Sequence, residues 1–189
     1  NVYAACLEEY ERHRMKVNKG VKMALDDVDK NLYVIGDRMR IMQVLMNLLS
    51  NAAKFTPSGE IHFGYQLRGN VVQFYVKDTG IGIPSSEQKK LFKIHFRGSN
   101  AINSKVTGSG IGLLLVWKLV HLHKGKINFT STEGKGSCIK VTFPKGEKPY
   151  RKAIHSPKPG SEKVAYAESG VPKNITPNIA YDATKQKQQ

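Results

Sequence analysis

Two asparagines and a lysine recur at helical spacing in the segment 38–54, and together they could meet a metal ion and phosphate. Asn47, Asn51 and Lys54 stand at positions i, i+4 and i+7, so a helix would align them in one polar stripe. An amide oxygen can ligate Mg²⁺, and a lysine one turn further on can contact phosphate. A solvent-facing helix side explains the same residue types without any function, and it is the better explanation of the stripe taken alone.

The segment 78–84 (DTGIGIP) combines a carboxylate with two glycines. Asp78 is predicted to end a strand on that strand's apolar face, where a carboxylate costs free energy unless it accepts hydrogen bonds. One explanation is that Asp78 caps the turn that follows. The other is that it accepts a hydrogen bond from the exocyclic amine of adenine, with Gly80 and Gly82 letting the backbone approach a flat base closely.

Glycines cluster at residues 108–113 (GSGIGL), where a helix is predicted to begin. Free backbone N–H groups and the positive end of the helix dipole can hold phosphate at such a place. A glycine cluster is weak support by itself, because glycines also make tight loops. The phosphate-loop pattern GxxxxGK(S/T) is missing, as is the protein-kinase set of GxGxxG, HRD and DFG, which excludes those two classes of nucleotide-binding protein.

The spacing of apolar residues predicts the elements that would position these groups. Asp37 is a suitable N-cap for a helix over residues 38–54. The inward face of that helix is predicted to carry Ile41, Leu45, Leu48 and Ala52. Other helices are predicted over residues 3–18, 85–93 and 111–123, and strands over 21–27, 31–37, 60–67, 71–78, 126–131 and 137–143. Residues 68–70 are predicted to form a hairpin turn, and the polar stretch 97–109 a mobile loop.

Length and composition fit one domain of ordinary size followed by a tail. The chain has 189 residues, of which 40% are hydrophobic. Its two cysteines, Cys6 and Cys138, form no CxxC pair, which favours reduced thiols over a disulfide framework. The longest apolar stretch, residues 111–116, is too short to cross a bilayer. We therefore expect a soluble chain that is a fragment of a longer protein.

The net charge of +15 could attract nucleic acid, anionic lipid or phosphorylated ligands. The basic residues are scattered, without a dense run of Lys and Arg and without regular interleaving of aromatics. We interpret the charge mainly as a solvated face with some attraction for phosphate, so nucleic acid is not an expected partner. Prolines break the chain after Pro144, which predicts a domain over residues 1–144 and a linker or extended tail over residues 145–189.

Four motifs follow one another in an order that is more specific than any one of them. The segments QVLMNLLSNAAKFTP, DTGIGIP, LFKIHFRG and GSGIGL closely resemble the N box, first glycine box, F box and second glycine box of bacterial sensor histidine kinases. The resemblance covers residues 3–144 and does not extend into the tail. It implies an α/β sandwich, with a mixed, mostly antiparallel sheet covered on one face by helices. This is the GHKL fold shared with gyrase, a heat-shock chaperone and mismatch-repair ATPases.

The resemblance also implies a set of ATP-binding residues. Asn51 would bind Mg²⁺ with Asn47 beside it, Lys54 would meet phosphate, and Asp78 would read the adenine amine. Phe92 would help to anchor a lid. The other residues implied at the nucleotide are Phe55, Gly80, Gly82, Ile83, Phe96, Arg97, Ser109, Gly110, Ile111, Gly112, Leu113 and Ser137.

The implied activity is transfer of the γ-phosphoryl group of ATP, with Mg²⁺, to a histidine on a dimerisation domain absent from this chain. In such transfer the protein mainly positions groups and neutralises charge, and no catalytic residue is assigned here. The implied partners are the dimerisation and phosphoacceptor domain of the same homodimeric parent and, indirectly, a response regulator. The implied location is the cytoplasm, either free or as the cytoplasmic part of a membrane-bound sensor.

Three alternatives stay open on the sequence. The first is a related GHKL-fold ATPase or protein-serine kinase, against which the F box and the short lid count. The second is a pseudokinase that binds nucleotide only for regulation. The third is a basic module without enzymatic activity, whose binding to nucleic acid would fall steeply with salt.

Overall fold

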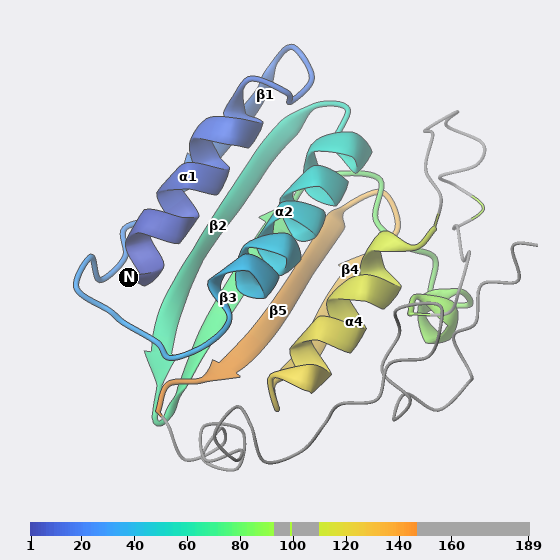
Figure 1. Cartoon of the computed structure of the whole chain (residues 1–189). Helices are drawn as coiled ribbons and strands as arrows, with labels where there is room; N and C mark the ends of the chain where they lie inside the picture. The colour runs from blue at the N-terminus through green and yellow to red at the C-terminus, as the bar shows by residue number, and fades with distance from the viewer. Residues whose placement is uncertain (93–98, 100–109, 147–189) are drawn as a thin grey trace, which may run out of the picture. The chain divides into compact units, whose positions relative to one another are not determined.

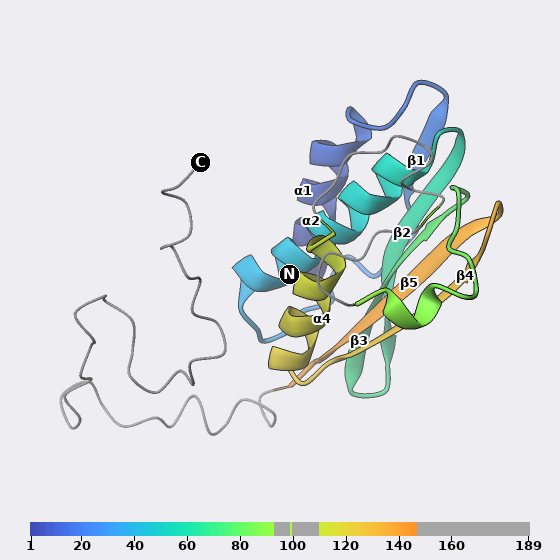
Figure 2. The ribbon, with the colours of Figure 1, turned by 90° about the vertical axis from the view of Figure 1, so that its right-hand side faces the viewer.

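The computed structural model describes residues 1–92, Ser99 and residues 110–146, which form a sheet with helices packed on one of its faces (Figures 1 and 2). The elements are the helices α1 (Val2–Arg14), α2 (Arg38–Phe55) and α4 (Gly112–Leu122), the 3₁₀ turn η1 (Gln88–Lys90), and the strands β1 (Val21–Leu25), β2 (Gly59–Arg68), β3 (Val71–Asp78), β4 (Lys126–Thr132) and β5 (Gly136–Pro144).

The sheet has the strand order β1-β2-β3-β5-β4. β1 pairs with β2 in parallel, and the remaining neighbours are antiparallel. β2 and β3 form a hairpin across Gly69, which has a φ of +56° that suits a residue without a β-carbon. The predicted fold, a mixed and mostly antiparallel sheet with helices on one face, is confirmed, as is the predicted hairpin.

The helix α2 forms for the reasons visible in its sequence. Asp37 caps its N-terminus, where the side-chain oxygen accepts a hydrogen bond from the N–H of Arg40 at 3.2 Å. The predicted inward residues are all buried in the core between the helices and the sheet: Ile41, Leu45, Leu48 and Ala52. They pack in the same core as the sheet residues Phe63, Phe74 and Phe143. The core therefore fixes which face of α2 turns away from the sheet.

Three of the predicted elements differ from the structure. Residues 31–37 form no strand with any described part of the chain. Leu32 is buried against α1 instead, and its carbonyl accepts from the N–H of Val2 at 2.9 Å. The first helix ends at Arg14, because the chain then turns so that Asn18 can donate to the carbonyl of Thr56 at 2.8 Å. The helix predicted over residues 85–93 is reduced to η1 within the described residues.

The chain that follows β1 stays beside the edge of β2. The hydroxyl of Tyr65 donates to the carbonyl of Asp29, and the hydroxyl of Tyr75 donates to Oδ2 of Asp26, both at 2.6 Å. Tyr75 lies opposite Gly64 in the β2–β3 register. A β-carbon on Gly64 would lie 2.6 Å from the Tyr75 hydroxyl, so the missing side chain leaves room for the phenol to cross β2.

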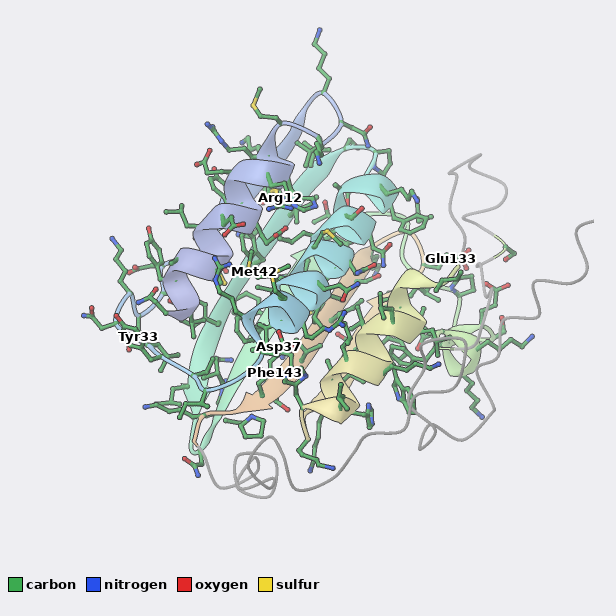
Figure 3. The ribbon with its side chains drawn as sticks, viewed as in Figure 1. Arg12, Tyr33, Asp37, Met42, Glu133 and Phe143 are labelled. Atoms are coloured by element: carbon green, nitrogen blue, oxygen red, sulfur yellow. The ribbon has the colours of Figure 1, made fainter. Side chains whose placement is uncertain are left out.

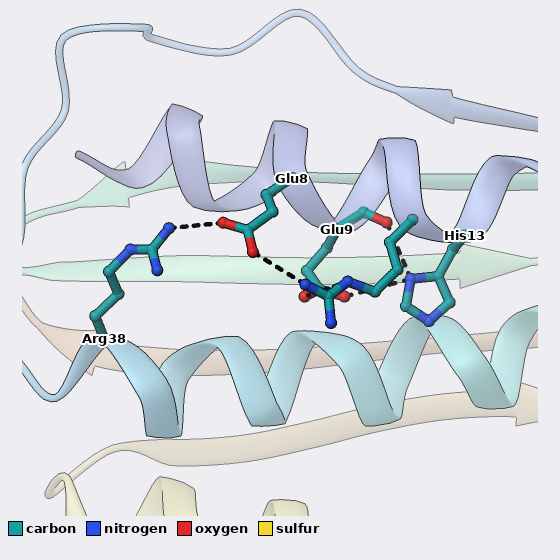
Figure 4. Close-up of polar contacts among 5 residues, drawn as sticks. Glu8, Glu9, His13 and Arg38 are labelled. Atoms are coloured by element: carbon teal, nitrogen blue, oxygen red, sulfur yellow. Dashed lines mark hydrogen bonds and ion pairs between the residues drawn. The ribbon is translucent and has the colours of Figure 1, made fainter.

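A buried carboxylate lies on α1, which packs beside α2 (Figure 4). Glu9 is only 1% exposed, and its Oε2 accepts no hydrogen bond from the described residues. The guanidinium of Arg12 lies 3.6 Å from Oε1, and Nδ1 of His13 lies 3.3 Å from Oε2 but is bonded to the backbone oxygen of Glu9. Burial raises the pKa of the Glu9 carboxyl, and the neighbouring cations only partly offset that effect.

We expect Glu9→Gln to gain stability relative to the wild type as the pH rises. A carboxyl whose pKa is raised by folding binds its proton more tightly in the native state, so ionisation near neutral pH weakens the fold. The free energy of unfolding of the variant, relative to that of the wild type, should increase by about 1 kcal/mol as the pH rises from 4 to 7. Urea unfolding at several pH values measures this, with Glu11→Gln on the exposed side of α1 as control. Parallel pH profiles for all three chains would contradict it.

Candidate functional site

Polar residues of α2 meet the beginning of α4 at one end of the sandwich. The two helices run side by side in opposite directions, so the C-terminal half of α2 faces the N-terminus of α4 (Figure 1). In Figure 3, Asp37 marks the far end of α2, and Glu133 marks the β4–β5 turn near this end of the sandwich. A β-carbon added to Gly112 would lie 3.0 Å from Asn47 Oδ1 and 3.9 Å from Asn51 Nδ2. The two amides therefore border the first turn of α4.

The two amides differ in their hydrogen bonding. Asn47 Nδ2 donates to the backbone oxygen of Gln43 at 2.7 Å, which holds Oδ1 toward Gly112. The Asn51 side chain has no hydrogen bond to any described residue, although it is partly buried. A wholly solvated helix face does not explain a stripe whose amides are half-buried against another helix. Lys54, by contrast, is exposed, and its ammonium lies 5.9 Å from the centroid of the Phe55 ring.

Asp78 ends β3 on the helix-covered face of the sheet. Its Oδ1 accepts from the N–H of Gly80 at 2.9 Å and from the N–H of Ser137 at 3.2 Å. Burial raises the pKa of this carboxyl, and the two hydrogen bonds only partly offset the effect. No hydrogen bond from the described residues reaches Oδ2. Capping of the turn thus accounts for the hydrogen bonds to Oδ1 of Asp78, and Oδ2 is available to a ligand.

The glycine-rich loop after β3 packs directly on the end of α2. A β-carbon on Gly80 would overlap the carbonyl oxygen of Phe55, and the N–H of Ile81 donates to that same oxygen at 3.0 Å. Only a residue without a side chain lets the two backbones come this close. The loop therefore ties the carboxylate of Asp78 to the end of the helix that carries the two amides.

The opposite side of this loop is held by the β4–β5 hairpin. The N–H of Ile83 donates to Ser131 Oγ at 2.9 Å, and the N–H of Gly134 donates to the carbonyl of Ile81 at 2.8 Å. Gly82 has a φ of +63°, and a β-carbon there would overlap the backbone of β4. The loop thus lies between α2 and the hairpin and contacts both.

The structure brings most of the predicted site residues to this end of the sandwich. Gly110, with a φ of +71°, and Ile111, 43% exposed, precede α4, whereas the Leu113 side chain packs against the core, so only its backbone can face a ligand. Around the same end lie Asn47, Asn51, Lys54, Phe55, Asp78, Gly80, Gly82, Ile83, Gly112 and Ser137. Outside the described residues lie Phe96, Arg97, Ser109 and, apart from Ser99, the predicted loop over 97–109.

Two residues that contact the loop were not predicted from the sequence. Ser131 Oγ binds the Ile83 N–H, and Gln88 Nε2 donates to the carbonyls of Ile83 at 3.1 Å and Ser131 at 3.0 Å. The sequence could have indicated Ser131, because it follows Ile127 and Phe129 on the inward face of β4, where a polar side chain needs a hydrogen-bond partner. The sequence gives no indication of a role for Gln88, since an amide after a turn is an ordinary surface residue.

Comparison with sequence families and curated proteins places the chain among nucleotide-binding proteins. The family described as histidine kinase-, DNA gyrase B- and HSP90-like ATPase matches residues 36–147. The circadian input-output histidine kinase CikA of Thermosynechococcus vestitus is 40% identical over 144 residues, which are 75% of this chain and 20% of CikA. The sensor histidine kinase WalK of Bacillus subtilis is 36% identical over 137 residues, 71% of this chain and 22% of WalK. The chain thus spans about one fifth of these relatives.

Solved structures share the fold. The catalytic domain of the histidine kinase ThkA superposes with a TM-score of 0.64 at 28% identity, over 77% of this chain and 95% of that domain. Full-length ShkA in complex with AMPPNP superposes with a TM-score of 0.65 over 79% of this chain and 31% of ShkA, and at 22% identity this likeness concerns the fold alone. None of the described helices has the length and apolarity that a membrane span requires.

We expect Gly80→Ala to destabilise the protein and to disturb the loop. The added methyl group overlaps the Phe55 carbonyl, so either the loop or the end of α2 must move, and overpacking of this kind costs about 1–3 kcal/mol. Urea unfolding measures the loss. The control is Gly146→Ala, at a position where a β-carbon meets no atom of the described residues within 4 Å. Equal stability of the two variants would contradict the close contact between loop and helix.

Proposed function

We propose that this chain is the ATP-binding catalytic domain of a two-component sensor histidine kinase. The chain belongs to the family of histidine kinase-, DNA gyrase B- and HSP90-like ATPases. The observation that carries the proposal is the convergence of three features at one end of the sandwich. These are the half-free carboxylate of Asp78, the amides of α2, and the glycine-bordered start of α4. The likeness to the ThkA catalytic domain supports the choice of a histidine kinase within the family.

Base recognition would rest on Asp78. Its Oδ1 is held by two backbone N–H groups, so Oδ2 can accept a hydrogen bond from the exocyclic amine of adenine. A base that carries a carbonyl at that position, such as hypoxanthine or guanine, offers no donor there and would face the carboxylate with like partial charge. The partly buried ring of Phe55 and the glycine loop, including Ile83, would contact the flat faces of the base.

The phosphates would lie between α2 and α4. The N-terminus of α4 presents backbone N–H groups beyond Gly110, where an anion is favoured by the helix dipole. The exposed ammonium of Lys54 can reach toward the same end, and Arg97 is predicted to add a second cation. These positive groups would offset the charge of a triphosphate, which is the main contribution a protein makes to phosphoryl transfer.

The donor set on α2 fits Mg²⁺. The Asn51 amide is half-buried and lacks a partner among the described residues, and Oδ1 of Asn47 is turned to the same side. Mg²⁺ prefers oxygen ligands and is usually held by one or two protein groups together with substrate phosphates and water. When bound, it would neutralise charge on the phosphate oxygens. Asn51 would hold it, with Asn47 next to it.

The phosphate acceptor would come from outside this chain. We propose a histidine on the dimerisation domain of a homodimeric parent, with a response regulator as the next acceptor. No side chain around the described site is positioned as a general base, so the acceptor domain would have to supply one. This assignment gives the chain the task of holding ATP and delivering its γ-phosphoryl group. We further propose that the parent works in the cytoplasm or at its membrane.

Mg²⁺ and ATP should raise the melting temperature of the 189-residue chain. At a free ligand concentration of 100 times Kd, linkage adds about 2.7 kcal/mol to the free energy of unfolding. Asp78→Asn should remove most of this shift, because an amide is a weaker acceptor than a carboxylate, whereas Asp27→Asn at an exposed position should keep it. A wild-type chain that melts at the same temperature with and without ATP would rule out nucleotide binding.

Phosphoryl transfer should require a second domain. With radiolabelled ATP, the chain alone should show little turnover, and addition of a separately made dimerisation domain carrying its histidine should give label on that histidine. Asn51→Ala should lower the rate by about 10–100-fold, the scale on which loss of a group that supports a bound metal lowers activity. Label on serine would indicate a protein-serine kinase of the same fold, and nucleotide binding without any transfer would indicate a pseudokinase.

A further inference from the structure

We propose that Ser131 is a positioning residue for base recognition, and that its hydroxyl locks the glycine loop and the Asp78 carboxylate into one rigid unit with the β4–β5 hairpin. This inference rests on the proposed function for its effect on ATP. The contacts themselves lie entirely within the chain.

The register of the sheet places the participants in one row. Ser131 lies opposite Ser137 in the β4–β5 pairing, and Ser137 lies opposite Asp78 in the β5–β3 pairing. All three side chains are on the helix-covered face, because each stands at a spacing of two from the inward-facing residues of its own strand. A polar row crosses three strands at the point where the sheet is otherwise apolar, and its middle member donates its backbone N–H to Asp78.

The Ser131 hydroxyl uses its full hydrogen-bonding capacity. Its Oγ lies 2.9 Å from the N–H of Ile83, 3.1 Å from the carbonyl of Gly136 and 2.9 Å from Oγ of Ser137. A hydroxyl has one hydrogen to donate and two lone pairs. The contacts are satisfied together if Ser131 donates to Gly136 and accepts from both Ile83 and Ser137. This one oxygen thus joins the loop to both strands of the hairpin.

Gln88 provides a second link between the same two segments. Its amide nitrogen has two hydrogens, and they are donated to the carbonyls of Ile83 and Ser131. Gln88 and Ser131 therefore bind both backbone groups of Ile83, the carbonyl and the N–H. A loop residue whose donor and acceptor are both bonded has little freedom to move, so the chain's own side chains hold the loop in place.

The consequence for recognition concerns the direction of the free oxygen of Asp78. Oδ1 is fixed by Gly80 in the loop and by Ser137 in the hairpin, so the angle at which Oδ2 meets a base depends on how these two segments are held together. Ser131 contacts both of them. Loss of the Ser131 hydroxyl should therefore weaken the hydrogen bond between Asp78 and the adenine amine. It should weaken the contacts that all purine nucleotides share to a smaller extent.

The test compares Ser131→Ala, Ser131→Thr and the control Thr130→Ala, whose position is on the opposite, exposed face of β4. We would measure the Kd for ATP and for inosine triphosphate, which has a carbonyl in place of the adenine amine. Ser131→Ala should raise the Kd for ATP about tenfold, on the scale of a lost hydrogen bond that leaves a donor unpaired, and should raise the Kd for inosine triphosphate less than threefold. Ser131→Thr keeps the hydroxyl and should stay within threefold of the wild type, as should Thr130→Ala.

A second measurement, on the nucleotide-free chain, follows hydrogen exchange at the amide of Ile83. Ser131→Ala should speed this exchange at least tenfold, and Thr130→Ala should leave it unchanged. Unchanged exchange in folded Ser131→Ala overturns the inference whether or not the chain binds ATP. An equal loss of affinity for both nucleotides also overturns it, because a merely structural role would lower both together. A wild-type chain that fails to bind ATP but shows the exchange effect would refute the proposed function and leave the lock itself supported.

Discussion

Two backbone N–H groups hold one oxygen of a half-buried carboxylate, and the arrangement of the candidate site depends on this interaction. The donors are Gly80 and Ser137, which belong to segments far apart in the sequence. Their meeting at Asp78 requires the glycine loop to lie between α2 and the β4–β5 hairpin. Burial still raises the pKa of Asp78, so the carboxylate is kept at a cost in stability. Such a cost in stability is expected at a functional site, where a buried hydrogen-bond acceptor is kept although an apolar side chain would pack there more favourably.

The position of the loop explains why glycines occur where they do. Gly80 permits contact with the end of α2, Gly82 permits contact with β4, and Gly112 leaves room for the amide of Asn47. Each glycine therefore marks a place where two backbones, or a backbone and a polar side chain, come closer than a β-carbon allows. The same reasoning does not extend to the turn glycines Gly69 and Gly134, where an added β-carbon meets no described atom within 4 Å and a positive φ is the reason for glycine.

The sequence predicted the parts of the fold that local pattern controls. The spacing of Ile41, Leu45 and Leu48 identified the buried face of α2, and alternation identified the four antiparallel strands. The prediction of a strand over residues 31–37 was wrong because Leu32 packs against α1 and not within a sheet. The local sequence does not show that the backbone of this segment has no strand partner among the described residues. Ser131 and Gln88 were missed because their partners are set by the meeting of the loop and the hairpin, a tertiary contact. The roles of Phe96, Arg97 and Ser109 remain predictions, as does the domain boundary after residue 144.

The crossing of Gly64 by the phenol of Tyr75 bears on a different property of the sheet, its tendency to pair with other chains. β1 pairs with β2 only as far as Phe63, so the β1-side edge of the rest of β2 is paired with no strand among the described residues. An uncovered strand edge offers a row of unpaired backbone groups to a neighbouring molecule and invites aggregation. The phenol fastens the chain after β1 along this edge through Asp26, and Tyr65 does the same through Asp29. The absence of a side chain at Gly64 thus allows the segment after β1 to be bonded along the open edge of β2.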